Sequence, residues 1–286
     1  MEYRFLTSDD LPQLQEANLA AFSNYAVKIE PSRDQLLRVL VRNGLRWDIS
    51  TGVFEGGRMI GFTANGFDYW NEQPTAYDSG TGVIPEHRRC GIALKLFDLM
   101  LARFREEGVR QYLLEVISSN EPALNLYRKL GFTETRRLEI VSLGQPLRTS
   151  NQARHPDELK IVEIAAPDWE LLQSFWTHQP SWANSIPAIK RSLSSKLMLG
   201  AYLSEQCVGY GIASASFGDI SQLAVAPAYR RHGIGSALLH ALHSRITPGK
   251  TATMNNIDSS SQETLAFART HGFNQVITQI EMMLQL

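Results

Sequence analysis

Two six-residue segments of the chain combine arginine and glycine in a pattern that suits phosphate binding. Arg88–Ala93 reads RRCGIA, and Arg230–Gly235 reads RRHGIG. Each segment follows a predicted strand and a proline, and a helix is predicted to begin at its glycine, Gly91 or Gly233. The first turn of a helix presents unpaired N–H groups and the positive end of the helix dipole, so it can bind a pyrophosphate. The arginines add positive charge and rigid hydrogen-bond donors.

Neither segment matches the two best-known phosphate-binding motifs. A Walker A loop ends in glycine, lysine and then serine or threonine, and that ending is missing here. The dinucleotide-binding fingerprint lies on the first strand of a parallel unit and spaces its glycines differently. The two segments therefore belong to another class of phosphate-binding loop.

The same order of landmarks occurs twice along the chain. Val83–Ala93 aligns with Val225–Gly235, and Leu130-Gly131-Phe132 aligns with His271-Gly272-Phe273 at a similar distance downstream. Such self-similarity indicates two copies of one structural unit, and 286 residues are enough for two domains. The predicted division is a first domain over residues 1–145, a linker over 146–157 and a second domain over 158–286.

Hydrophobic periodicity and turn residues predict strands and helices in a similar order in both halves. In the first half, strands are predicted over 3–6, 49–54, 58–69, 75–83, 112–117 and 132–143, with helices over 7–22, 32–43, 91–107 and 122–130. In the second half, strands are predicted over 159–164, 196–202, 207–213, 220–225, 251–254 and from 273 onward, with helices over 168–175, 186–193, 233–245 and 261–270. The pattern predicts an α/β protein of the α+β type.

The composition favours a small-molecule or peptide partner. Lys and Arg total 28 and Asp and Glu total 29, so the formal net charge of −1 creates no general attraction for nucleic acid or anionic lipid. The two cysteines, Cys90 and Cys207, lack the spacing of a metal site or a disulfide framework, and no metal is expected. The sequence shows no signal peptide and no apolar run long enough to cross a bilayer. We therefore expect a cytoplasmic protein without a nucleic-acid or membrane partner.

The two arginine–glycine segments resemble motif A of the GNAT family (GCN5-related N-acetyltransferases), which reads Arg/Gln-x-x-Gly-x-Gly/Ala. The preceding Val-x-Pro matches in both halves, and the resemblance covers nearly the whole chain apart from the linker. It implies two tandem domains, each with a mixed, mostly antiparallel twisted sheet flanked by helices and with a slot where two strands splay apart. It also implies an acyl-CoA, usually acetyl-CoA, as the cofactor. The residues that it places around the cofactor are Val83, Arg88, Arg89, Gly91, Ala93, Asn120, Val225, Arg230, Arg231, Gly233 and Gly235.

The first half also resembles motif B of the family, over Leu114–Asn120 and onward through Tyr127 to Leu130-Gly131-Phe132. The resemblance implies that Tyr127 protonates the departing CoA thiolate, because a phenol can donate a proton as charge grows on sulfur. It also implies that Asn120 orients amides of the cofactor. In the second half, Phe267 lies where the tyrosine is expected, and phenylalanine has no proton to give. We therefore predict that the first domain is the catalytic one, and it stays open whether the second transfers an acyl group or only binds.

The acceptor amine must lose a proton before or during its attack, which requires a general base. The strand before the first loop carries Asp78, which we predict as this base, and Asp219 is the candidate in the second half. Tyr77 and Glu115 are alternatives. Members of the family often work through a chain of water molecules, so the base need not contact the substrate.

These residues together predict an acyl-CoA-dependent N-acyltransferase in which a primary amine of a small molecule or peptide attacks the thioester directly. Two alternatives stay open, namely a protein that binds and senses acyl-CoA without turnover and a transferase of the same fold that uses another acyl donor. The sequence carries no signal that identifies the acceptor or the oligomeric state. The segments expected to form the acceptor pockets, Phe22–Pro31 and Thr177–Pro187, carry no diagnostic chemistry.

Overall fold

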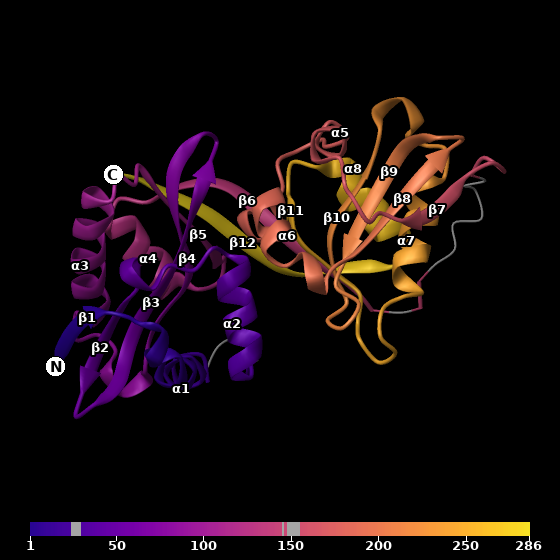
Figure 1. Cartoon of the computed structure of the whole chain (residues 1–286). Helices are drawn as coiled ribbons and strands as arrows, with labels where there is room; N and C mark the ends of the chain where they lie inside the picture. The colour runs from indigo at the N-terminus through magenta and orange to yellow at the C-terminus, as the bar shows by residue number, and fades with distance from the viewer. Residues whose placement is uncertain (24–29, 145, 148–154) are drawn as a thin grey trace. The chain divides into compact units, whose positions relative to one another are not determined.

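The computed structural model describes residues 1–23, 30–144, 146–147 and 155–286 (Figure 1). Contacts divide the chain into two compact units. The first unit consists of Met1–Val116, Pro122–Thr135 and Glu281–Leu286, and the second consists of Ile117–Glu121 and Arg136–Ile280. Each unit therefore draws on segments that are far apart in the sequence.

The first unit is built on a mixed sheet whose main strands follow chain order. Its strands are β1 (Glu2–Phe5), β2 (Thr51–Glu55), β3 (Arg58–Trp70), β4 (Gln73–Val83) and β5 (Gln111–Ile117). Neighbours from β1 to β4 are antiparallel, whereas β4 and β5 are parallel. This arrangement confirms the predicted mixed, mostly antiparallel sheet.

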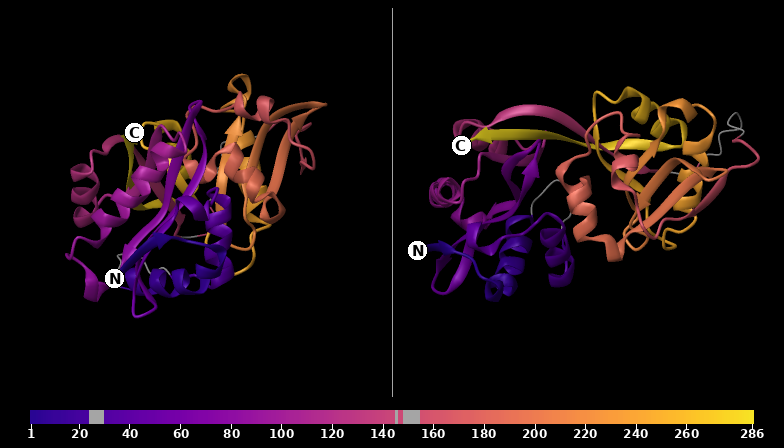
Figure 2. Two further views of the ribbon diagram at one scale, coloured as in Figure 1. Left: turned by 60° about the vertical axis from the view of Figure 1, so that its left-hand side comes forward. Right: turned by 45° about the horizontal axis from the view of Figure 1, so that its top comes forward.

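Helices cover both faces of this sheet (Figures 1 and 2). The helices are α1 (Leu11–Ala21), α2 (Arg33–Arg42), α3 (Ile92–Glu106) and α4 (Glu121–Lys129). Leu14 of α1 and Leu40 of α2 pack with Phe62 in one apolar cluster. Leu96 of α3 packs with Val53 in another cluster. Because successive side chains of a strand point to opposite faces, the two clusters fix α3 on the face opposite α1 and α2.

The second unit repeats the arrangement of the first. Its strands are β7 (Lys160–Glu163), β8 (Leu197–Leu203), β9 (Gln206–Ala213), β10 (Asp219–Val225) and β11 (Thr253–Asp258), and its helices are α5 (Trp169–Gln173), α6 (Ile186–Arg191), α7 (Ile234–His243) and α8 (Gln262–Thr270). Strands β7 to β10 are antiparallel neighbours, and β10 and β11 are parallel. The predicted internal repeat is therefore present in the fold.

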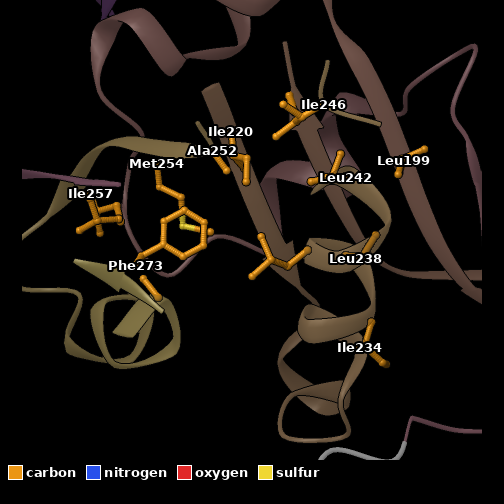
Figure 3. Close-up of a cluster of buried hydrophobic side chains, with 14 of the residues drawn as sticks. Leu199, Ile220, Ile234, Leu238, Leu242, Ile246, Ala252, Met254, Ile257 and Phe273 are labelled. Carbon is orange, nitrogen blue, oxygen red and sulfur yellow. The ribbon is translucent and has the colours of Figure 1, made fainter. Parts of the chain in front are cut away.

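An apolar cluster holds α7 against the sheet of the second unit (Figure 3). Ile234, Leu238 and Leu242 are spaced one turn apart along α7, and all three are buried. They belong to the same cluster as Ile220 of β10 and Met254 of β11. Burial of each such side chain contributes roughly 1.5–3 kcal/mol. The first turn of α7 lies beside the end of β10, where the Cβ position of Gly235 is 3.7 Å from Val225.

In each unit, the two parallel strands pair only near their beginnings. The ladder between β4 and β5 ends at the pair Tyr77–Leu113, and the ladder between β10 and β11 ends at the pair Ile220–Met254. All four strands continue for several residues beyond these pairs. The strand edges that face each other there have no ladder bonds among the described residues. Each unit thus contains the slot between splayed strands that the family resemblance implies.

Two strands run from one unit into the other. Strand β6 (Thr133–Leu143) begins in the first unit and then pairs with β11 in the second. Strand β12 (Phe273–Gln285) begins in the second unit, and its residues from Glu281 onward belong to the first. Within the first unit, the Thr133 hydroxyl donates to the carbonyl of Met283 at 3.3 Å. The end of the chain is therefore part of the first unit.

The predicted domain limits follow chain order, with a linker over 146–157. The contact-based units do not follow chain order, because β6 and β12 are shared between them. Of the predicted linker, residues 148–154 lie outside the part of the chain that the structure describes.

Ending the chain at Ile280 should destabilise the first unit selectively. The lost segment carries buried Met282 and Met283, and the N–H of Leu286 donates to the carbonyl of Arg110. We expect the first unit to unfold about 5–10 °C earlier, with faster amide hydrogen exchange in β5 and unchanged protection in α7. The control is Gln285→Ala, which alters an exposed side chain. Unchanged exchange in β5 of the shortened chain would contradict the assignment of β12 to the first unit.

Candidate functional site

The loop that leads into α3 has the backbone of an anion-binding turn. A short 3₁₀ turn at Pro85–His87 follows β4, and both Arg89 and Gly91 then adopt positive φ, of 64° and 74°. Gly91 is the N-cap of α3, and nothing lies within 4 Å of the position that a Cβ there would occupy. The first N–H groups of a 15-residue helix therefore face an open space, where an anion is stabilised by the helix dipole.

The corresponding turn of the second unit has nearly the same φ angles. A 3₁₀ turn at Pro227–Tyr229 follows β10, Arg231 has a φ of 66°, and Gly233 has a φ of 75° at the N-cap of α7. The position of a Cβ on Gly235 lies 3.4 Å from the ring of Phe267, so the first turn of α7 approaches an aromatic side chain. Both units thus present the same helix N-terminus.

The first arginine of each segment turns back toward its own unit. Arg88 donates from Nε to the carbonyl of Val83 at 3.1 Å and from Nη2 to the carbonyl of Ala21 at 2.6 Å. Arg230 makes the matching bonds, to Val225 and Phe175, both at 3.0 Å. In the first unit these bonds link the loop to β4 and to the end of α1. In the second unit they link it to β10 and to the segment just after α5. The geometry fits a role in positioning the loop, and contact of Arg88 and Arg230 with a ligand stays a prediction.

The remaining loop residues lie at the surface or along the slot. Arg89 and Arg231 are exposed, and they directly follow Arg88 and Arg230 in the sequence. Val83 and Val225 end β4 and β10, where each strand pairs with one neighbour only. Their free strand edges can pair with amide groups of an extended ligand. Ala93 and Gly235 belong to the first turns of α3 and α7.

The two residues predicted to be catalytic, Asp78 and Tyr127, lie together at the closed end of the first slot. Asp78 directly follows Tyr77, the last residue of β4 that pairs with β5. The Tyr127 hydroxyl donates to Asp78 Oδ2 at 3.5 Å. Asp78 also accepts from the Gly80 N–H at 2.9 Å and from the Thr81 hydroxyl at 2.8 Å. The strand order thus brings together two groups that are 49 residues apart in the chain.

Burial changes the acid–base properties of this pair. Asp78 and Tyr127 are both less than one-tenth exposed, and the Tyr127 ring packs against Phe97 and Phe132. Desolvation raises the pKa of Asp78 from its ordinary value of 3.8 to about 6, against the opposing effect of its hydrogen bonds. A carboxyl group with such a pKa can exchange a proton near neutral pH. The arrangement can therefore both accept and deliver protons at the closed end of the slot.

Asn120 is not grouped with this pair. It lies between β5 and α4 in the segment Ile117–Glu121, which belongs to the second unit, and its backbone N–H donates to the carbonyl of Ile117 at 2.9 Å. Asp78 and Tyr127 belong to the first unit. The predicted contact of Asn120 with the cofactor stays a prediction.

Both slots begin with a bulge of one residue. In β4 the extra residue is Ser79, and in β10 it is Ser221, as shown by the register shifts against β3 and β9. A bulge redirects the side chains that flank it and is frequent beside functional sites. Because the two bulges correspond, they align the two strands residue by residue.

This alignment shows that the second unit lacks both members of the Asp78–Tyr127 pair. Ile220 stands in the position of Asp78. Helices α4 and α8 have nine residues each and end at matching distances from their glycine–phenylalanine landmarks, which places Ala268 in the position of Tyr127. The match between the two halves of the sequence had assigned that position to Phe267. In the structure, Phe267 corresponds to the residue before Tyr127. The correction arises because the buried face of α8 carries Ala268, whereas Phe267 turns toward Gly235.

The acidic residue predicted as the base of the second half has a different environment. Asp219 accepts from the Lys196 ammonium group at 2.9 Å and from the Ser221 hydroxyl at 3.1 Å. The Lys196 side chain is only 4% exposed. Because the Asp219 carboxylate is engaged by the Lys196 ammonium group and the Ser221 hydroxyl, this geometry favours a structural role for Asp219.

Neither a metal-binding cluster nor a membrane-spanning helix occurs in the described part of the chain. No group of three or more His, Cys, Asp or Glu side chains there is arranged to hold a metal ion. No helix within the same residues is both long and apolar enough to cross a membrane.

Comparisons with known proteins agree with this geometry. A model of the acetyltransferase (GNAT) family matches residues 11–132, and a model of the acetyltransferase (GNAT) domain matches residues 194–275. Streptothricin acetyltransferase of Streptomyces lavendulae is 37% identical over 76 residues, which is 27% of this chain and 39% of that protein. The chain spans less than half of the length of the curated relatives that it matches.

Two solved structures share the fold along nearly the whole chain. A GCN5-related N-acetyltransferase from Sphaerobacter thermophilus has a TM-score of 0.73 and 17% identity, covering 99% of this chain and 95% of that one. A tandem GNAT protein from the clavulanic acid biosynthesis pathway has a TM-score of 0.73 and 14% identity, covering 99% and 98%. At these identities the likeness concerns the fold alone.

The raised pKa of Asp78 predicts a pH-dependent loss of stability. The folded protein holds the Asp78 proton more tightly than the unfolded chain, so ionisation above the unfolded value of 3.8 and up to about 6 favours unfolding. Relative to Asp78→Asn, the wild-type protein should lose about 2–3 kcal/mol of stability between about pH 4 and pH 7. Denaturant unfolding of both proteins across this range measures the difference. A constant difference would show that Asp78 titrates normally.

Proposed function

Because this chain belongs to the GNAT family of acetyltransferases and carries two GNAT domains in tandem, we propose that its first unit transfers an acetyl group from acetyl-CoA to a primary amine. The acceptor is a small molecule or a peptide. The observation that carries this proposal is the hydrogen-bonded pair of Asp78 and Tyr127 at the closed end of the slot. No comparable pair occupies the matching positions of the second unit.

The donor would be held by the loop and the slot of the first unit. The N–H groups at the start of α3, together with the exposed Arg89, suit its pyrophosphate, and the open position at Gly91 leaves room for it. The unpaired strand edge near Val83 suits the amides of its pantetheine arm. Its thioester supplies an activated acyl group to an attacking amine.

The two buried side chains account for the proton balance. When the amine nitrogen forms its bond to the acyl carbon, the carbon–sulfur bond breaks, the nitrogen loses a proton and the thiolate must gain one. Tyr127 gives its proton to the thiolate. Asp78, which accepts the Tyr127 hydrogen bond, takes up the proton from the amine, directly or through water, and returns it to Tyr127. One proton thus passes from the amine to the thiolate through the pair.

A second candidate function applies to the second unit, which we propose binds an acyl-CoA without transferring its acyl group. The turn at Gly233 has the torsions of the turn at Gly91, so the site for the pyrophosphate is equivalent. Ile220 and Ala268 replace the Asp78–Tyr127 pair and cannot carry a proton. A transferase of the same fold with another acyl donor is a further outcome that the binding experiments below would reveal.

Tyr127→Phe should lower kcat by about 10–100-fold, because the departing thiolate loses its proton donor. Binding of acetyl-CoA should stay within about twofold, since the ring and its packing remain. Release of free thiol with a panel of primary amines measures turnover, and calorimetry measures binding. The control is Tyr69→Phe, which removes a hydroxyl from an exposed residue. Full turnover of the Tyr127 variant would remove this residue from the mechanism.

Gly91→Glu should abolish binding of acetyl-CoA to the first unit, because the new side chain enters the phosphate site and repels the ligand. Gly233→Glu should do the same in the second unit, so each variant loses one of two binding sites in a calorimetric titration. The matched control is Gly57→Glu, which places the same side chain at positive φ in open space, in the β2–β3 turn. Two intact sites in either loop variant would refute the placement of the pyrophosphate.

A further inference from the structure

A serine side chain at the start of the first slot carries a buried hydroxyl without a partner. Ser79 is the extra residue of the bulge in β4, and it comes two residues after Tyr77, where the ladder to β5 ends. Its hydroxyl oxygen is shielded from water and has no hydrogen-bond partner within the residues that the structure describes. A buried hydroxyl that stays unpaired lowers stability, so its presence calls for a reason other than folding.

The polar groups next to Ser79 along the strand are engaged with one another. Asp78 accepts hydrogen bonds from the Gly80 N–H, the Thr81 hydroxyl and the Tyr127 hydroxyl. The Ser79 hydroxyl takes no part in this network. Ser79 as a whole is nevertheless partly exposed, and the β4 edge on which it lies has no ladder bond to β5 beyond Tyr77. The slot therefore leads to this residue.

The matching serine of the second unit is fully engaged. The Ser221 hydroxyl accepts from the Lys196 ammonium group at 2.8 Å and donates to Asp219 Oδ2 at 3.1 Å. The same residue type at the same bulge is thus paired in the unit that lacks the acid–base pair and unpaired in the unit that carries it. This contrast connects the free hydroxyl with the chemistry of the first unit.

The second unit also indicates which face of the sheet the serine occupies. The Ser221 hydroxyl contacts Asp219, two residues earlier, whereas Ile220 between them packs in one cluster with the buried residues of α7. The serine of the bulge therefore lies on the face opposite α7. Because the two bulges correspond, Ser79 lies on the face opposite α3, whereas Asp78 lies on the side of α3 and α4.

We propose that the Ser79 hydroxyl donates a hydrogen bond to the acyl oxygen of the donor thioester and stabilises the negative charge that this oxygen gains during the transfer. The proposal rests on the acetyl transfer proposed above. It makes Ser79 a third catalytic residue of the first unit, beside Asp78 and Tyr127. The acyl group of the donor is then the partner that this hydroxyl lacks within the protein.

The positions of the three side chains divide the reaction between the two faces of the sheet. Tyr127 protonates the departing sulfur on the side of α3 and α4, so the acyl carbon beyond this sulfur lies next to Ser79. When the amine nitrogen bonds to this carbon, one electron pair of the carbonyl moves to its oxygen, and it returns as the carbon–sulfur bond breaks. Ser79 keeps its proton throughout. With no bond to hold it, its hydroxyl can rotate about χ1 to meet the acyl oxygen.

Ser79→Ala separates catalysis from folding, because turnover and stability should not fall together. Release of thiol with the amine panel should drop about 100-fold, mainly in kcat, as when one donor to a developing oxyanion is removed. The midpoint of denaturant unfolding should stay unchanged or rise, since the variant loses an unpaired buried hydroxyl. The matched control is Ser221→Ala, which removes a paired hydroxyl at the same bulge and should lower that midpoint without lowering turnover.

A spectroscopic readout tests the hydrogen bond in the absence of an amine. Acetyl-CoA labelled with ¹³C at the acyl carbonyl is bound to Gly233→Glu, so that the first unit supplies the remaining site. Infrared difference spectra then record the stretching band of the labelled carbonyl. A hydrogen bond from Ser79 weakens the carbonyl bond, so this band should lie at a lower frequency than in the protein that also carries Ser79→Ala.

Two results would overturn the proposal directly, namely full turnover of Ser79→Ala and a carbonyl band that does not differ between the two proteins. A loss of turnover that comes with lower stability and weaker binding of acetyl-CoA would also overturn it, because Ser79 would then have a structural role. If no amine of the panel releases thiol, the acetyl transfer itself fails. The infrared comparison still decides in that case whether Ser79 contacts the acyl oxygen.

Discussion

The early end of the ladder between β4 and β5 is the constraint on which the first site depends. Beyond Tyr77–Leu113 the two strands separate, and the bulge at Ser79 comes directly after. The separation frees a strand edge for an extended ligand, and Asp78 lies at the point where it begins. Tyr127 reaches this point from α4, and α3 begins beyond the other end of β4. The binding and the proton transfer that we propose therefore both depend on one interruption in backbone pairing.

The second unit shows that the backbone arrangement of the slot and the turn can be kept without the Asp78–Tyr127 pair. It repeats the short ladder, the bulge, the clamped arginine and the glycine at positive φ. The two positions of the acid–base pair carry Ile220 and Ala268, which fill space and hold no proton. The backbone geometry of the slot and the turn is thus preserved while the side chains at the closed end change.

Because β6 and β12 each contribute residues to both units, neither half of the chain supplies a complete unit by itself. Residues from Glu281 onward complete the first unit, and Thr133 and Thr135 of β6 hydrogen-bond to them.

The sequence by itself determined the repeat, the order of the elements and the two arginine–glycine turns, because these depend on local periodicity and on residues that are close in the chain. It also identified Asp78 and Tyr127 separately. Only the tertiary structure decided that the two meet, since strand order and the position of α4 bring them together. The same holds for the match of Ala268 to Tyr127, which depends on the buried face of α8, and for Glu281, which reaches the first unit through a pairing between strands more than 150 residues apart.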